Sequence, residues 1–298
     1  AADEPSQEEG RRQAPQEPEG ATQEHVRTLL KAVLLRERPV FDRSFFCPHP
    51  FTAEPVSYRP GVGYDFPMKF GILVFPGTWS DRDCGYALES LGQEIEYVWH
   101  ADTDIDRFDA LVVPGGFSYG DYLRAGAIAR FAPVMKSVSK FAADGRGVIG
   151  ICNGFQILCE AELLPGVLMR NDHLEFRCTW TDLKVENDQT MFSHSAKNGD
   201  LLRVPISHGE GSYQADEDTI ADLEETGRVL FRYSGPAGEV TPEWNPNGSI
   251  NNIAGIINET GNVLGMMPHP ERACDPLIGG KDGAAIFRSM FTKIPALN

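Results

Sequence analysis

From residue 68 onward, short apolar runs alternate with stretches that have helical periodicity. The run Lys69–Phe75 ends at Pro76-Gly77, as expected for a buried strand that leads into a loop. Further strands are predicted over residues 94–99, 110–113 and 147–151, and helices over 81–91, 121–143 and 155–164. Strands that alternate with helices at this spacing predict an α/β fold with a mostly parallel sheet covered by helices on both faces.

The second half of the chain has a more β-like pattern. Strands are predicted over residues 176–185, 201–205, 229–233, 253–257 and 263–267, and a final helix over 283–291. Asn258–Asn262 supplies a turn between the last two strands. Pro133 marks a break or a new start within the helical stretch 121–143. We therefore expect residues 68–298 to form one α/β domain.

Residues 1–67 differ from the rest of the chain in composition. They hold nine of the 21 prolines and open with a polar, acidic stretch. Such a segment buries too little apolar surface to offset the loss of chain entropy on folding, so it is predicted to be a largely flexible N-terminal extension. Within it, Glu24–Glu37 has one apolar face and predicts a short helix.

Composition and charge narrow the class of protein. The net charge of −16 and the pI near 4.8 argue against a nucleic-acid groove, which needs clustered Lys and Arg. No apolar run approaches the roughly 18 residues of a membrane span, and no signal-peptide pattern is present. The six cysteines form no C-x-x-C pair, which is typical of reduced thiols. We expect a soluble cytoplasmic protein that binds neither nucleic acid nor membrane.

A candidate nucleophile lies where the strand 147–151 meets the helix that follows. Gly150-Ile151-Cys152-Asn153-Gly154 has the form Gly-x-Cys-x-Gly, and glycines flank a nucleophile where the strand-to-helix turn is too tight for side chains. A helix that begins after Cys152 would favour its thiolate. The alternative is a cysteine that only fills the core, which is how we interpret Cys159.

The loop Pro114–Asp121 is a candidate for stabilising negative charge. In open α/β sheets, sites form at the carboxyl ends of the strands, and this loop follows such an end. The backbone N–H of Gly115, Gly116 or Phe117, together with that of Asn153, would form an oxyanion hole, in which one donor contributes about 10²- to 10³-fold in rate. A simple turn is the alternative interpretation.

His269 is the candidate base among the seven histidines. It follows the strand 263–267 and lies two residues before Glu271, which would hold the imidazole while its other nitrogen faces the thiol. His208, in the sequence His208-Gly209-Glu210-Gly211, is a second candidate for ligand contact, with a solvated turn as the alternative. His173 and His194 are expected to be surface or hydrogen-bonded residues.

These motifs together resemble the class I, triad-type glutamine amidotransferases. The resemblance rests on the Cys152 corner, on Pro114–Asp121 and on Pro268-His269-Pro270-Glu271. Similarity also extends to Phe75-Pro76-Gly77, the continuation of the loop to Gly126, Pro205–Gly211 and Gly265–Arg272, and there it points to the glutaminase subunits of formylglycinamidine ribonucleotide synthase. The resemblance covers about residues 68–298. Members of that family normally start near Met68, so the extension is a departure.

The resemblance implies a flavodoxin-like fold and a glutaminase activity in purine biosynthesis. Cys152 would attack the side-chain amide of glutamine, giving a glutamyl thioester and ammonia. His269 carries over as the general acid and base, and Glu271 as the residue that orients it. Gln156 and the loop at Gly115 and Gly116 would contact glutamine.

The resemblance also implies partners for the chain. Ammonia would pass to a large synthetase subunit that uses ATP and Mg²⁺, and a third, small subunit would bridge the two. This chain has no P-loop, so no cofactor and no metal site are expected in it. Two alternatives remain, namely another cysteine hydrolase or redox chaperone on a similar sheet, and a catalytically silent binding subunit.

Overall fold

The computed structural model describes residues 67–292 of the chain. Its first half comprises β1 (Lys69–Val74), α2 (Asp81–Ser90), β2 (Glu94–Trp99), β3 (Ala110–Val113), α3 (Pro133–Ala143), β4 (Gly147–Ile151) and α4 (Asn153–Glu160). Its second half comprises β5 (Val167–Met169), β6 (Arg177–Val185), β7 (Leu201–His208), β8 (Ser212–Gln214), α5 (Glu217–Glu225), β9 (Val229–Ser234), β10 (Ile253–Ile257), β11 (Val263–Met266) and α6 (Ala284–Phe291). The extension and the predicted helix Glu24–Glu37 lie outside the described residues.

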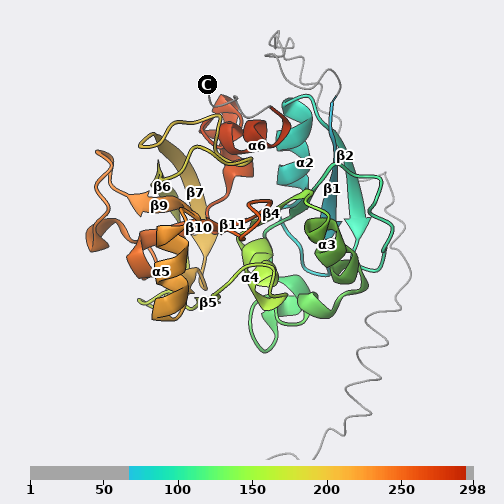
Figure 1. The fold of residues 1–298 in the computed structure, drawn as a ribbon, viewed down its shortest axis with the longest axis horizontal. Helices are drawn as coiled ribbons and strands as arrows, with labels where there is room; N and C mark the ends of the chain where they lie inside the picture. The colour runs from blue at the N-terminus through green and yellow to red at the C-terminus, as the bar shows by residue number, and fades with distance from the viewer. Residues whose placement is uncertain (1–66, 293–298) are drawn as a thin grey trace, which may run out of the picture. The chain divides into compact units, whose positions relative to one another are not determined.

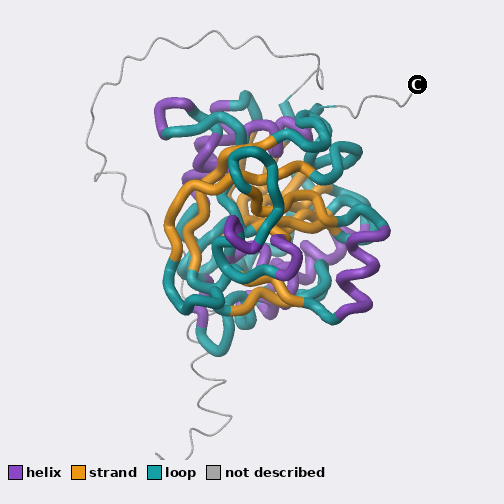
Figure 2. The backbone as a smooth tube through the Cα atoms, turned by 90° about the vertical axis from the view of Figure 1, so that its left-hand side faces the viewer, coloured by secondary structure: helices purple, strands orange, loops and turns teal. Residues whose placement is uncertain are grey.

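A nine-stranded sheet runs through residues 67–292 in the order β2-β1-β3-β4-β11-β10-β9-β6-β7. The pairs from β2 to β11 are parallel, and the pairs from β11 to β7 are antiparallel. Seven of these strands therefore point in one direction, and only β10 and β6 run the other way. The expectation of an α/β fold with a mostly parallel sheet is confirmed. Figure 2 looks onto the antiparallel end, where loops and short helices lie in front of the strands.

Helices cover both faces of the parallel part of the sheet (Figure 1). The crossover from β1 to β2 moves toward one edge, whereas the crossover from β3 to β4 moves the other way. Because such crossovers are right-handed, α2 and α3 lie on opposite faces. A side chain added at Gly150 or Gly265 would collide with α4, whereas one added at Gly147 would meet Met290 of α6, so these two helices also cover opposite faces.

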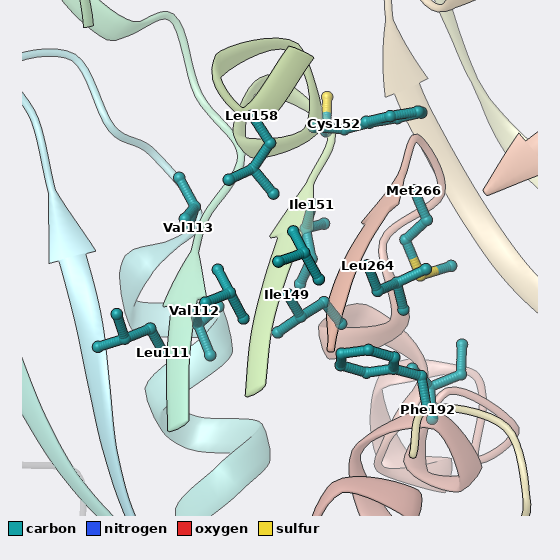
Figure 3. Packing of buried hydrophobic residues seen from close by; sticks show 14 of the residues in the cluster. Leu111, Val112, Val113, Ile149, Ile151, Cys152, Leu158, Phe192, Leu264 and Met266 are labelled. Carbon is teal, nitrogen blue, oxygen red and sulfur yellow. The ribbon is translucent and has the colours of Figure 1, made fainter. Parts of the chain in front are cut away.

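The core lies between these layers and supports the end of β4. Val112, Ile149 and Leu264 are in register on neighbouring strands and are fully buried. In Figure 3, the sulfur of Cys152 lies just beyond Ile151, above this apolar layer. The carboxyl ends of β1, β3, β4, β11 and β7 all reach the same edge of the sheet, and the candidate residues leave the sheet there.

The predicted helix 121–143 is wrong in its first half. The α-helix begins only at Pro133; Asp121 ends a 3₁₀ turn at Ser118–Asp121, and residues 122–132 form a loop with a further 3₁₀ turn at Ala129–Phe131. Asp121 and Leu123 have positive φ values of 53° and 71°, which no helix allows. Gly126 lies so close to the backbone of α4 that a Cβ there would be 2.8 Å from the Ile157 nitrogen. Contact with α4 therefore overrides the local helical periodicity.

The β10–β11 turn agrees with the predicted bounds, whereas the end of α4 does not. The hairpin of β10 and β11 turns through Asn258–Asn262 as predicted, while α4 ends at Glu160 instead of Leu164. A positive φ of 60° at Glu162 excludes a longer helix. The sequence pattern did not predict α5 or the small β5–β8 sheet. Within residues 67–292, every helix is too short or too polar to cross a bilayer.

Candidate active site

Cys152 occupies a strained corner between β4 and α4. Its φ of 53° and ψ of −107° lie in a region that side chains rarely adopt, at a typical cost of about 1–3 kcal/mol. The cysteine N–H donates to the Met266 carbonyl at 2.8 Å, which ties the corner to β11. A Cβ on Gly154 would overlap the Val113 carbonyl oxygen, so this position needs glycine. The predicted nucleophile corner is therefore present in three dimensions.

His269 and Glu271 form a buried pair after β11. His269 Nδ1 is 2.6 Å from Glu271 Oε1, and the two residues are 2% and 1% exposed. Burial alone would lower the pKa of His269, but the negative charges of Glu271 and Cys152 outweigh burial and raise that pKa well above its usual value. His269 Nε2 has no partner among the described residues. The pair can hold one imidazole tautomer and leave Nε2 for proton transfer.

The thiol and the imidazole meet beside Gly115. A Cβ added to Gly115 would lie 2.9 Å from His269 Cε1 and 3.4 Å from Cys152 Cβ. Only a residue without a side chain fits here. Cys152 Sγ is also 3.7 Å from the Ser207 carbonyl oxygen, at the end of β7. The structure thus brings the three predicted triad residues together.

The predicted oxyanion loop is held in one orientation. The Gly115 carbonyl accepts hydrogen bonds from the N–H groups of Trp79 and Ser80, both at 3.0 Å. Because the peptide is planar, the Gly116 N–H points away from these donors. The Phe117 N–H donates to the Gly77 carbonyl at 2.9 Å and is already paired. Of the three predicted N–H donors in this loop, Phe117 is therefore the least suited to stabilise an oxyanion.

Asn153 connects the first turn of α4 to the same loop. Its side-chain oxygen accepts from the Ser118 N–H at 3.0 Å, and its amide nitrogen donates to Gln156 Oε1 at 2.9 Å and Asp121 Oδ1 at 3.3 Å. Gln156 Nε2 donates in turn to the Glu210 carbonyl at 2.6 Å. As the first residue of α4, Asn153 has an N–H group without an intrahelical acceptor. It remains our second predicted oxyanion donor.

His208 is buried, so a solvated turn is excluded. Its Nε2 is 3.0 Å from Asn247 Nδ2, which is a donor, so Nε2 accepts and the ring hydrogen sits on Nδ1. Burial, followed by the charges of His269 and His173, lowers the pKa of His208 to about 3. The ring is therefore neutral at physiological pH.

The loop that contains His208 is clamped by Asn171, which the sequence did not single out. Asn171 is fully buried, and its side chain donates to the His208 carbonyl at 2.9 Å and accepts from the Gly211 N–H at 3.0 Å. Its own N–H donates to the Gly209 carbonyl at 2.9 Å. This residue fixes the backbone on both sides of Glu210.

His173, His194 and Cys159, which we expected to lie outside the site chemistry, are hydrogen-bonded or buried in the core. His173 is hydrogen-bonded to the Pro246 carbonyl and His194 to the Thr190 carbonyl, each at 2.9 Å. Cys159 is 7% exposed within the core, and burial raises the pKa of its thiol. These predictions are confirmed.

A cavity of about 310 Å³ lies over the triad. Of the predicted residues, it is lined by Gly116, Phe117, Cys152, Gln156, His208 and His269. It is also lined by residues that we did not predict as site residues, namely Trp79, Ser80, Asp121, Phe176, Ser207, Gly209, Glu210 and Arg272. Several of them directly adjoin predicted residues in the sequence, which is the signal that could have found them. Within residues 67–292, no group of three or more His, Cys, Asp or Glu is arranged to hold a metal ion.

Comparison with known families defines the class. A family model described as the CobB/CobQ-like glutamine amidotransferase domain matches residues 67–280. This match spans well over half of the chain and includes Cys152, His269 and Glu271. The chain is therefore an enzyme of the glutamine amidotransferase class.

Curated relatives narrow the class further. Phosphoribosylformylglycinamidine synthase subunit PurQ of Moorella thermoacetica is 59% identical over 224 residues, covering 75% of this chain and 95% of that protein. The PurQ subunit of Salinibacter ruber is 52% identical, covering 76% and 97%. A chain in the structure of PurLQS from Thermotoga maritima is 42% identical with a TM-score of 0.68, covering 76% and 98%. The chain belongs to the family of PurQ subunits of phosphoribosylformylglycinamidine synthase.

Proposed function

We propose that this chain hydrolyses glutamine to glutamate and ammonia through a thioester on Cys152, as the glutaminase subunit of phosphoribosylformylglycinamidine synthase. The observation that carries the proposal is the buried His269–Glu271 pair, 2.6 Å apart, beside a cysteine on a strained strand-to-helix corner. Nucleophile, base and orienting carboxylate are the three parts that covalent amide hydrolysis needs.

The first half of the reaction forms the thioester. The Cys152 thiol gives its proton to His269 Nε2, and the sulfur attacks the amide carbon of glutamine. The charge that develops on the amide oxygen is stabilised by the N–H groups of Gly116 and Asn153, where one donor contributes about 10²- to 10³-fold. His269 then returns the proton to the amide nitrogen as the carbon–nitrogen bond breaks, and ammonia leaves.

The second half releases glutamate. His269 takes a proton from water, whose oxygen attacks the thioester carbon, and the carbon–sulfur bond breaks to regenerate the thiol. Glu271 accepts the hydrogen bond from His269 Nδ1 and stabilises the imidazolium that forms in each half. Gln156 and His208 line the cavity and are our candidates for holding glutamine in place.

The ammonia is used elsewhere, in a partner subunit. The solved relative from Thermotoga maritima is part of a PurLQS structure, which supports an assembly in which this chain works with other subunits. We propose that this chain supplies ammonia to a large synthetase subunit that holds ATP and Mg²⁺, with a small subunit bridging them, in purine biosynthesis. The five cysteines of the described part are free thiols, which supports a reducing cytoplasmic setting.

The test replaces the nucleophile in the assembled enzyme. Cys152→Ala is expected to lower glutamine-dependent synthesis by about 10³-fold or more, because the thioester cannot form. Synthesis from added ammonium salts should be unchanged, since the thiol takes no part in the ATP-dependent step. Cys159→Ala is the matched control and should leave both activities near the parent values. If an intact Cys152→Ala complex lost synthesis from glutamine and synthesis from ammonium salts to the same extent, the proposal would be refuted.

A further inference from the structure

Arg272 follows the triad carboxylate directly and takes no part in the steps of the proposed reaction. Its guanidinium makes two hydrogen bonds to the start of α2. Nε donates to Asp83 Oδ2 at 3.0 Å, and Nη2 donates to Ser80 Oγ at 2.8 Å. The same Nε is 3.9 Å from Glu271 Oε1, which is too far for a hydrogen bond. One side chain therefore connects the segment that carries the base to the start of α2.

Ser80 uses its side chain differently from most serines that precede a helix. It is 1% exposed and occupies the N-cap position of α2, where a serine oxygen normally accepts from an N–H of the first turn. Here the side chain makes no capping hydrogen bond, and its oxygen accepts from Arg272 instead. The Ser80 N–H donates to the Gly115 carbonyl at 3.0 Å. Ser80 thus links Arg272 to the oxyanion loop through two different groups.

The peptide between Gly115 and Gly116 is the part of the oxyanion loop that this link controls. Its carbonyl is fixed by the N–H groups of Trp79 and Ser80, and its N–H is the proposed oxyanion donor of Gly116. Ser80 Oγ lies directly beside this peptide, since a Cβ on Gly115 would be 3.2 Å from it and 2.9 Å from His269 Cε1. A small shift of Ser80 would therefore turn the donor away from the reacting amide, and a misplacement of about 1 Å can cost about 10²-fold in rate.

The stability of the fold does not explain these contacts. The side chains of Arg272 and Asp83 are 28% and 45% exposed, and exposed ion pairs of this kind contribute little to folding. The Ser80 hydroxyl adds no capping hydrogen bond to α2. Loss of either the guanidinium or the hydroxyl should therefore leave the fold nearly as stable as before.

We propose that Arg272 and Ser80 are positioning residues for the oxyanion donor of Gly116 and act without binding glutamine. The assignment rests on the proposed glutaminase function. Asp83 orients the guanidinium, Arg272 holds the Ser80 side chain, and the Ser80 N–H holds the oxyanion peptide. The link keeps the charge-stabilising loop aligned with the segment that carries the base, although the two lie far apart in the sequence.

The test measures glutamine hydrolysis by the assembled enzyme that carries Arg272→Gln, Ser80→Ala or both. Each single substitution is expected to lower kcat about 10-fold or more and to leave KM within about 2-fold, because the donor acts in the transition state. The double variant should lose no more than the more severe single variant, since Arg272 acts through Ser80. Arg203→Gln, which changes an exposed arginine of β7 outside the cavity, is the matched control and should change neither parameter.

A second measurement tests whether Arg272 binds the substrate. In the Cys152→Ala background, calorimetric titration should give the same dissociation constant for glutamine with and without Arg272→Gln. Thermal unfolding should place the Tm of each single variant within about 2 °C of the parent value.

An unchanged kcat, weaker glutamine binding or a large fall in Tm would each overturn the assignment. A double variant whose loss equals the product of the two single losses would also overturn it, because the two residues would then act independently. Failure of the parent enzyme to hydrolyse glutamine would instead refute the glutaminase function, so the two failures are distinguishable.

Discussion

Cys152 is positioned by its backbone more than by its side chain. Its φ and ψ of 53° and −107° are maintained because β4, β11 and α4 fix the residues on both sides. Gly115 leaves room where the thiol meets His269, and Gly154 leaves room against β3. The strain is therefore part of a site whose geometry is set before substrate binds.

At the scale of single residues, the raised pKa of Asp121 also predicts a pH dependence of glutamine hydrolysis. Burial and the charge of Glu210 raise the pKa of Asp121 to about 6, while the hydrogen bond from Asn153 acts in the opposite direction. The carboxylate is charged above that pH and neutral below it. The neutral carboxyl accepts the hydrogen bond from Asn153 more weakly than the carboxylate does, so kcat/KM for glutamine should fall as pH falls through about 6.

Steady-state kinetics of the assembled enzyme between pH 5 and 8 would measure this fall in kcat/KM. The other titratable groups that line the cavity are Cys152, Glu210, His208, His269 and Arg272. The pKa of His208 is lowered to about 3 and that of His269 is raised well above its usual value, so neither histidine changes charge near pH 6. Asp121→Asn should flatten the profile, and a profile that keeps its shape in this variant would assign the titration to another group.

Between elements, α4 packs against the sheet at unusually short range. Gly150 on β4 and Gly265 on β11 face Leu158 and Phe155 of the helix, and any side chain at either glycine would collide with them. Gly154, on the helix itself, leaves no room for a side chain against the end of β3. This close approach brings the α4 N-terminus, and with it the Cys152 thiol, over the carboxyl ends of the central strands.

Gly154→Ala tests that packing. The added methyl group would overlap the Val113 carbonyl oxygen, and overpacking of this kind costs about 1–3 kcal/mol. For a domain of this size, thermal unfolding should therefore show Tm lower by roughly 2–12 °C. Gly209→Ala is the matched control, because the atom closest to its added methyl group would be Phe176 Cδ2 at 3.5 Å. Equal Tm values for the two variants would contradict the packing account.

The local sequence pattern was enough to predict the elements that position Cys152 and His269. The strand–corner–helix around Cys152 and the β10–β11 hairpin before His269 have strong short-range signals, and both are where the sequence predicts them. The helix expected over 121–132 fails because contact with α4 at Gly126 decides the path of that loop. Asn171 was missed since its role depends on backbone groups about 40 residues away.

On the scale of the whole chain, residues 1–67 remain a predicted extension without a part in the domain. The family match begins at residue 67, and every described strand and helix lies within 69–291. A fragment of residues 68–298 should therefore unfold within a few degrees of the full chain and keep its glutaminase activity. Thermal unfolding with parallel activity assays would measure this. A large fall in Tm would show instead that the apolar face of Glu24–Glu37 docks on the domain.

The loop after β3 is where we expect the domain to contact the proposed synthetase subunit. Phe117 is 52%, Tyr122 73% and Leu123 95% exposed, and all three belong to the loop that leads from the oxyanion glycines. Exposed apolar side chains that belong to one loop make that loop a candidate for contact with a partner. Ammonia released into neutral water is mostly protonated and no longer a nucleophile, so a partner that covers the cavity mouth avoids wasting glutamine.

We expect Leu123→Glu to weaken that contact. A charge placed in a desolvated interface should raise the dissociation constant of the synthetase complex by about 10-fold or more. Glutamine-dependent synthesis should fall with it when subunits are limiting, and saturating synthetase should restore it, because the triad is untouched. Leu277→Glu is the matched control, since Leu277 is 86% exposed on a different loop that does not line the cavity. Titration of either variant against the synthetase subunit by calorimetry measures the difference, and equal affinities would place the partner on another face.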